Sequence, residues 1–168
     1  MIRTIAAMLG VLTLAGCAAE NVAPEQPAFY LDMAHGGAKL DAAVAASMIS
    51  GYRANNGLGA VTVDADLMKV AETQSMAMAK RNKMDHNVAG PLPRRLAAAG
   101  YPATLAVENV GAGYHTLAEA FSGWRDSPSH RENMLKKGVT KLGIAATYAP
   151  DSKYKVFWTL VLASTDQR

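Results

Sequence analysis

The segment TLAEAFSGWRDSPSHRENML, residues 116–135, carries the signals for two short helices with a corner between them. Thr116 and Glu119 are spaced as a capping box, in which a hydroxyl and a carboxylate each accept a hydrogen bond from a free backbone N–H group. Ser127 and Pro128 restart the chain, since serine suits the N-cap and proline the first helical position. The second helix therefore begins at a fixed corner, and we expect a functional site in its first turn.

The same segment carries a recognisable motif. Residues 124–135, WRDSPSHRENML, resemble the W-x-x-S-P-x-H-R-x-N-[IL]-L core of bacterial CAP-superfamily domains, the SCP/PR-1-like family. The resemblance extends to the E-N-V motif at residues 108–110 and to Arg53, although Ser50 stands where the family pattern N-x-x-R has asparagine. It implies an α+β fold, the α-β-α sandwich of CAP domains, over residues 41–163.

The N-terminus reads as a bacterial lipoprotein signal peptide over residues 1–16. Arg3 is followed by an apolar run over residues 5–14, which is too short for a comfortable transmembrane helix. Leu-Ala-Gly-Cys, ending at Cys17, resembles the lipobox and implies cleavage before Cys17 and a lipid on that residue. The residue after Cys17 is Ala18 and not aspartate. By the sorting rule of Gram-negative lipoproteins, this resembles the signal for the outer membrane. We expect an exported protein, anchored by lipid in the outer membrane and facing the periplasm or the cell surface.

The rest of the chain suits one domain. Cys17 is the only cysteine, so the mature domain has no disulfide and no cysteine nucleophile. Proline and glycine in residues 17–40 predict a flexible tether that follows the lipidated cysteine. Residues 41–163 are expected to form the domain, and residues 164–168 a short C-terminal tail. The formal net charge is only +3, and the basic residues are scattered with few aromatic neighbours. We therefore expect no nucleic-acid partner. We do expect contact with the membrane, through the lipid on Cys17.

Helical periodicity and strand composition predict the order of elements within the domain. The first three are helices, and residues 106–113 are a glycine-rich turn. After residue 135 the pattern changes to a β-hairpin, whose second strand is apolar on both faces and is expected to be covered on both. The predicted helices cover residues 41–56, 64–80 and a short stretch between Pro91 and Gly100, and the predicted strands cover residues 139–148 and 154–163.

Three polar residues, His86, Glu108 and His130, each lie at the boundary of a predicted element. Two histidines and a carboxylate can form a zinc site with one open position, although no H-E-x-x-H motif is present. The alternative is a hydrogen-bonded network that fixes the corner. The resemblance places the matching positions around one cleft, which in many CAP proteins holds a divalent metal with two histidines and two acids. Here the second acid position is Ser127.

The resulting prediction is a non-catalytic binding protein of the cell envelope. The expected ligand is a small apolar molecule, a metal ion or an envelope protein. The alternative is a metal-dependent or serine-type hydrolase, because Ser127 and Ser129 flank His130 and Glu108 could orient an imidazole. No G-x-S-x-G elbow supports it. The candidate ligand-binding residues are His86, Glu108, His130, Arg131 and Asn133, and the candidate metal ligands are His86, Glu108 and His130.

Overall fold

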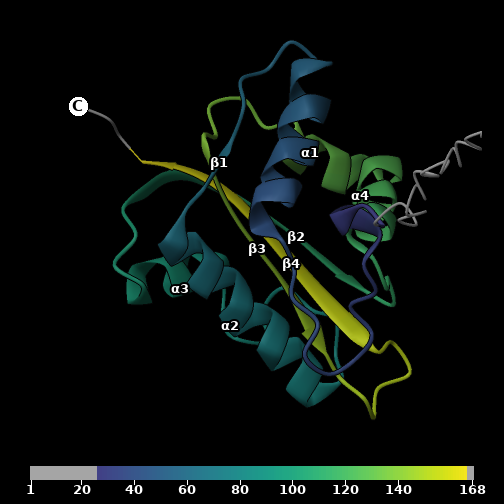
Figure 1. Cartoon of the computed structure of the whole chain (residues 1–168). Helices are drawn as coiled ribbons and strands as arrows, with labels where there is room; N and C mark the ends of the chain where they lie inside the picture. The colour runs from purple at the N-terminus through teal and green to yellow at the C-terminus, as the bar shows by residue number, and fades with distance from the viewer. Residues whose placement is uncertain (1–25, 166–168) are drawn as a thin grey trace, which may run out of the picture.

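The computed structural model describes residues 26–165 (Figure 1). The predicted signal peptide, Cys17 and residues 166–168 lie outside the described residues. Among the described residues, no helix combines the length and hydrophobicity needed to cross a bilayer. The elements, in chain order, are η1 (Ala28–Tyr30), α1 (Ala42–Ala54), β1 (Thr62–Val63), α2 (Ala65–Arg81), α3 (Leu92–Ala98), β2 (Ala103–Ala112), α4 (Leu117–Asp126), α5 (Pro128–Met134), β3 (Lys141–Tyr148) and β4 (Val156–Thr165).

The strands form one four-stranded mixed sheet in the order β1-β3-β4-β2. β3 and β4 make the predicted antiparallel hairpin, β2 is antiparallel to β4, and β1 is parallel to β3. β4 lies inside the sheet, and its residues from Val156 to Ala163 are all buried. The prediction that this strand is covered on both faces is therefore confirmed.

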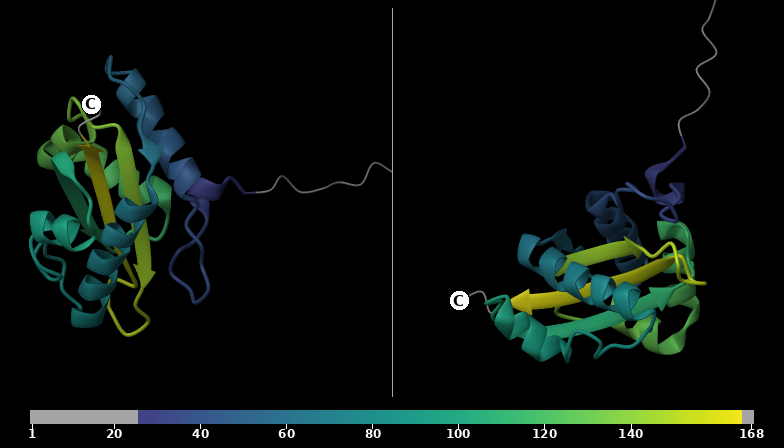
Figure 2. Two further views of the ribbon diagram at one scale, coloured as in Figure 1. Left: turned by 90° about the vertical axis from the view of Figure 1, so that its left-hand side faces the viewer. Right: turned by 90° about the horizontal axis from the view of Figure 1, so that it is seen from below.

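Helices cover both faces of the sheet (Figures 1 and 2). On one face, Ile49 of α1, Trp124 of α4 and Met134 of α5 pack with Trp158 and Leu160 of β4. On the opposite face, α2 and α3 contribute Leu67, Val70 and Leu96, which pack against Val161 of β4. The α+β fold and its α-β-α layering are confirmed.

Close packing of α2 on the sheet depends on a glycine in β3. A Cβ atom added at Gly143 would overlap the backbone carbonyl group of Leu67. Those backbone atoms belong to the first turn of α2 and have no side-chain freedom with which to move aside. Gly143 therefore sets how closely α2 approaches the sheet.

Residues 26–40, which the sequence assigns to the tether, pack on the domain in the structure. Met33 is 5% exposed, and its backbone N–H donates to the carbonyl of His115 over 2.7 Å. Phe29 is partly buried against the same core. These apolar contacts hold a segment that proline and glycine alone would leave extended, so the prediction of a flexible tether is wrong for this part of the chain.

Two local predictions also need correction. Residues 106–113, predicted as a turn, lie mainly in β2, which continues to Ala112. Glycine and the polar pair Glu108-Asn109 are typical of a turn, so the local sequence does not predict a strand here. The extended conformation comes from pairing with β4. Ser127 occupies the N-cap of α5 but makes no side-chain capping bond there, whereas the predicted capping box of Thr116 and Glu119 is present.

Candidate functional site

The candidate site is built around the edge strand β2, where two adjacent polar residues point in opposite directions. Successive side chains of a strand lie on opposite faces of the sheet. The Glu108 side chain therefore lies on the α2–α3 side, and the Asn109 side chain lies on the side of α5. This alternation connects the helices on the two faces through one dipeptide.

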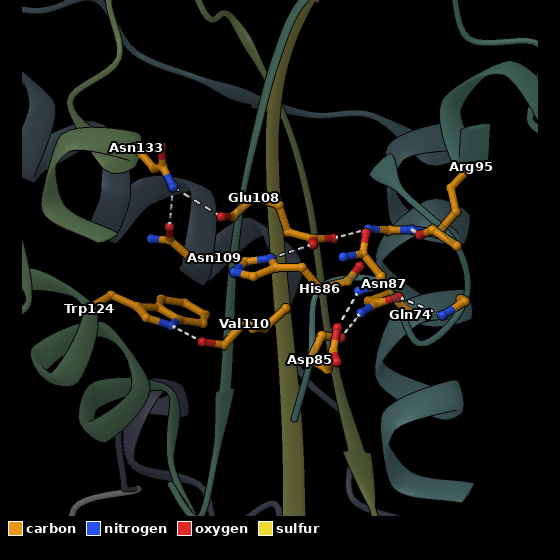
Figure 3. Close-up of polar contacts among 12 residues, drawn as sticks. Gln74, Asp85, His86, Asn87, Arg95, Glu108, Asn109, Val110, Trp124 and Asn133 are labelled. Carbon is orange, nitrogen blue, oxygen red and sulfur yellow. Dashed lines mark hydrogen bonds and ion pairs between the residues drawn. The ribbon is translucent and has the colours of Figure 1, made fainter. Parts of the chain in front are cut away.

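Glu108 is buried and bonded through both carboxylate oxygens (Figure 3). Arg95 Nη2 donates to Oε2 over 2.5 Å, and both side chains are 4% exposed. His86 Nδ1 lies 2.9 Å from Oε1. A carboxylate beside a guanidinium accepts hydrogen bonds, so this contact places a proton on Nδ1 of His86 and leaves Nε2 for other partners.

Arg95 is the site residue that sequence reasoning missed. It comes from α3, and its Nε donates to the carbonyl of Gly90 over 2.9 Å while Nη2 also reaches the carbonyl of His86 at 3.4 Å. The arginine therefore ties the loop before α3 to β2. One general rule could have suggested such a residue, because a carboxylate that becomes buried in an apolar strand needs a cationic partner.

His86 lies in the loop after α2, and a buried glutamine holds this loop in place. Gln74 of α2 donates through Nε2 to the carbonyl of Asp85 over 2.7 Å and accepts from the backbone N–H of Ala89 over 3.2 Å (Figure 3). Asp85 itself accepts from the backbone N–H of Asn87. The imidazole is thus presented from a fixed loop, with its side chain 53% exposed.

The two histidines have pKa values shifted in opposite directions. The hydrogen bond to Glu108 raises the pKa of His86, against partial burial and the charge of Arg95, which lower it. Burial lowers the pKa of His130, and the neighbouring charge of His86 lowers it further. Near neutral pH, His86 is therefore the more readily protonated of the two and His130 the less readily protonated.

On the α5 side, amide groups connect the second helix of the motif to β2. Asn109 Nδ2 donates to the backbone carbonyl of His130 over 2.9 Å. Asn133 Nδ2 donates to Asn109 Oδ1 over 2.9 Å and to the backbone carbonyl of Glu108 over 3.0 Å (Figure 3). Asn133 thus fixes α5 against the strand, and Trp124 does the same for α4 by donating from Nε1 to the carbonyl of Val110 over 3.2 Å.

The five predicted ligand-binding residues do not all meet. His86 and Glu108 are in direct contact, whereas His130 joins the network through its backbone carbonyl. Asn133 uses its amide for structural contacts. Arg131 is exposed on α5, and within residues 26–165 it makes no ion pair.

The predicted metal set does not fit this arrangement. Each oxygen of Glu108 already has a partner, and one of them belongs to the buried ion pair with Arg95. In the part of the chain that the structure describes, no group of three or more His, Cys, Asp or Glu side chains is placed to hold a metal ion. A carboxylate that orients a histidine through Nδ1 acts behind a ligand rather than as one.

The serine arrangement required by a hydrolase is also incomplete. Over residues 26–165, neither Ser127 nor Ser129 makes a side-chain hydrogen bond to the imidazole of His86 or His130. The carboxylate–imidazole pair is present, as in a catalytic triad, but a hydroxyl within hydrogen-bond distance of Nε2 is what would complete it.

Comparison with known proteins defines the family. Residues 46–162 match the model of the cysteine-rich secretory protein family, named CAP, and the chain belongs to this family. Over 94 residues it is 30% identical to the uncharacterized protein YkwD of Bacillus subtilis (strain 168), a match that covers 55% of this chain and 37% of that protein.

Two solved structures share the fold. An extracellular protein containing an SCP domain from Bacillus anthracis str. Ames is 26% identical with a TM-score of 0.64, over 73% of this chain and 39% of the other. An outer surface protein from Borrelia burgdorferi is 21% identical with a TM-score of 0.66, over 73% of this chain and 91% of the other. The chain thus corresponds to well under half the length of the two Bacillus relatives. The two solved relatives are named as extracellular and outer surface proteins.

Proposed function

We propose that this CAP-domain protein is an exported, lipid-anchored binding protein of the cell envelope that does not catalyse a reaction. One observation carries the proposal: the half-exposed imidazole of His86 is held through Nδ1 by a buried carboxylate. Its Nε2 is left to donate to, or accept from, a ligand. A free ring nitrogen that can donate or accept favours a polar ligand or a polar partner surface over the purely apolar molecule expected from the sequence.

The binding role is tested on the lipidated protein extracted in detergent from the membranes of producing cells. Native mass spectrometry of the wild type should detect a copurified small molecule or ion, and the His86→Asn variant should lose it. His35→Asn changes an exposed histidine outside the network and serves as the matched control. Equal occupancy in both variants, or no bound species in the wild type, would contradict a His86-centred ligand site.

The lipid anchor rests on the sequence around Cys17 and is consistent with the extracellular and outer-surface relatives. Labelling of growing cells with radioactive or alkyne-tagged palmitate should mark the wild type and leave Cys17→Ser unmarked. The variant should accumulate as the unprocessed precursor. Equal labelling of Cys17→Ser would rule out this anchor without bearing on His86.

Hydrolysis is the second candidate, and the Glu108–His86 pair is the observation that favours it, because such a pair orients a general base in serine hydrolases. The proposal of a non-catalytic protein predicts that p-nitrophenyl acetate is cleaved no faster by the wild type than by Ser127→Ala and Ser129→Ala. Turnover that depends on His86 and on either serine would replace the binding role with catalysis.

A further inference from the structure

Two large apolar side chains lie exposed next to each other near the start of the described residues. Tyr30 is the last residue of η1 and is 50% exposed, and Leu31, which follows it, is 41% exposed. With the exposed Pro27, these residues form what we call the η1 patch. Single exposed hydrophobic residues are ordinary, whereas adjacent ones form a surface that a partner or a membrane can cover. Elsewhere in residues 26–165, the large exposed hydrophobic residues lie on separate segments: Val63, Met76 and Met84.

The η1 patch is presented from a fixed base. Phe29 packs partly buried against the core between the sheet and the helices α1 and α4, and Met33 is buried in the same core. The rings of Phe29 and Tyr30 lie with their centroids 4.6 Å apart. The backbone N–H of Tyr30 donates to the carbonyl of Pro27 over 2.9 Å, and Gln26 Nε2 donates to the carbonyl of Tyr30 over 3.0 Å. The patch therefore has little conformational entropy left to lose when it makes a contact.

The position of the patch places it near the proposed lipid. η1 lies outside α1 and α4, on the opposite side of the sheet from α2 and α3 (Figure 2). Only residues 18–25 separate Cys17 from Gln26, and a chain of that length spans at most about 30 Å even when fully extended. An anchored domain is thus confined to a thin layer beside the bilayer, and this confinement raises the effective concentration of the patch at the lipid surface.

The chemistry of the patch suits the headgroup region of a bilayer. Tyrosine combines an apolar ring with a polar hydroxyl and is enriched at this depth in membranes. No lysine or arginine occurs in residues 26–38, and the carboxylate of Asp32 accepts from the backbone N–H of Ala34 over 2.7 Å. Attraction to anionic lipids therefore has no source in this segment, and contact with a membrane depends on the apolar side chains.

We propose that the η1 patch docks on the bilayer that carries the lipid of Cys17, with Tyr30 and Leu31 at the depth of the headgroups. Docking fixes the orientation of the domain, so that the side of α1 and α4 faces the membrane and the side of α2 and α3 faces away from it. The inference rests on the lipid anchor of the proposed function. The alternative occupant is a second copy of the chain, which the test below distinguishes from lipid.

The test uses the full lipidated protein, purified in detergent and reconstituted into phosphatidylcholine liposomes. Both native tryptophans, Trp124 and Trp158, are buried, so a tryptophan added at the surface reports on its own surroundings. Tyr30→Trp should lose at least about half of its added fluorescence when the lipids carry bromine in their upper acyl chains. Met76→Trp is the matched control and should not be quenched, because Met76 is 48% exposed on α2, on the opposite side of the sheet.

Two further measurements identify the contact as the apolar patch. Adding Leu31→Ser to Tyr30→Trp should clearly reduce the quenching, whereas adding Val63→Ser, at a similarly exposed position on β1, should leave it unchanged. Quenching should also persist in about 1 M salt, where the Debye length is about 3 Å. Equal effects of Leu31→Ser and Val63→Ser, or loss of quenching in salt, would overturn docking through this patch.

Flotation of the liposomes tests the anchor separately. Protein that does not float with them would overturn the lipid anchor and the docking together. Protein that floats without quenching of Tyr30→Trp would overturn the docking alone, as would equal quenching of Tyr30→Trp and Met76→Trp. Emission that is blue-shifted but not quenched would show that a second copy, the only other protein in the sample, covers the patch instead of lipid.

Discussion

Glu108 joins three parts of the chain at a single carboxylate. Arg95 reaches it from α3, His86 from the loop after α2, and the residue itself belongs to β2. An ion pair buried to this degree gains little net stability over an apolar replacement, because both charges are desolvated. Removing only one partner is different, since the other charge then stays buried without compensation.

Glu108→Gln is therefore expected to destabilise the domain by about 3 kcal/mol, with the uncompensated Arg95 as the main cause. Urea unfolding followed by circular dichroism measures the change. Glu132→Gln is the matched control, because Glu132 is exposed on α5 and should change the free energy of unfolding by less than about 0.5 kcal/mol. An unchanged unfolding midpoint for Glu108→Gln would mean that the pair does not stabilise the fold.

The two histidines should titrate on opposite sides of about pH 6.5, the usual value for the side chain. A raised pKa means that His86 contributes stability at pH values below about 6.5, and this contribution is lost as the pH rises through its folded-state pKa. A lowered pKa means that His130 contributes stability above about pH 6.5, which is lost as the pH falls through its folded-state pKa.

The side-chain NMR signals of the two imidazoles give these midpoints directly. Glu108→Gln should lower the midpoint of His86, because the hydrogen bond that raises it is lost. His86→Asn should raise the midpoint of His130 by removing a neighbouring positive charge. Coincident midpoints in the wild type would contradict the different environments of the two rings.

At the scale of elements, the contact of α2 with β3 can be tested with a pair of glycines. Gly143→Ala places a methyl group against the backbone of Leu67 and should destabilise the domain by about 2 kcal/mol or more. Gly51 lies within α1 with nothing near its Cβ position, so Gly51→Ala should stabilise by about 0.5–1 kcal/mol. Melting temperatures should therefore move in opposite directions, and a loss in both variants would argue against the close contact.

The sequence predicts helices and the hairpin well because their periodicity and capping are local. Thr116 and Glu119 form their capping box within four residues, and β4 is apolar enough to be identified as an inner strand. β2 is different. Its conformation comes from pairing with β4, more than forty residues later, while Glu108-Asn109 and the following glycines favour a turn locally. Tertiary pairing overrides that local preference.

At the scale of the whole molecule, Arg53 fastens α1 to the chain that follows α5. Its side chain is almost fully buried, and the guanidinium donates to the carbonyls of Gly59, Met134, Lys136 and Val139 at 2.8–3.2 Å. Three of these acceptors lie more than eighty residues away along the sequence. The arginine maintains the connection between the two halves of the chain in place of a disulfide.

Arg53→Met should therefore destabilise the domain by about 3 kcal/mol, since several buried carbonyls lose a charged donor together. Hydrogen exchange measured by mass spectrometry should show the largest increase over residues 134–140. Arg81→Met, at the exposed end of α2, is the control and should change neither quantity. An increase in exchange that is equal along the whole chain of Arg53→Met would contradict this prediction, because it would show that Arg53 does not specifically hold residues 134–140.

The structure brings together only some of the residues named from the sequence. His86 and Glu108 meet as the polar-network hypothesis requires, and His130 lies at the predicted corner. Arg95 was not predicted, because its role depends on how α3 packs beside β2 and no local pattern marks it. The sequence can predict that a buried carboxylate needs a cationic partner. Which residue becomes that partner is decided by the tertiary structure.

The side-chain bonds to β2 also bear on self-association. Glu108 and Val110 direct their carbonyls to the free edge of the sheet, where Asn133 and Trp124 already donate to them. A strand from another molecule could pair here only by displacing both side chains, and the opposite edge, β1, is just two residues long. The sheet is thus protected against edge-to-edge aggregation, which matters for any protein concentrated on a surface.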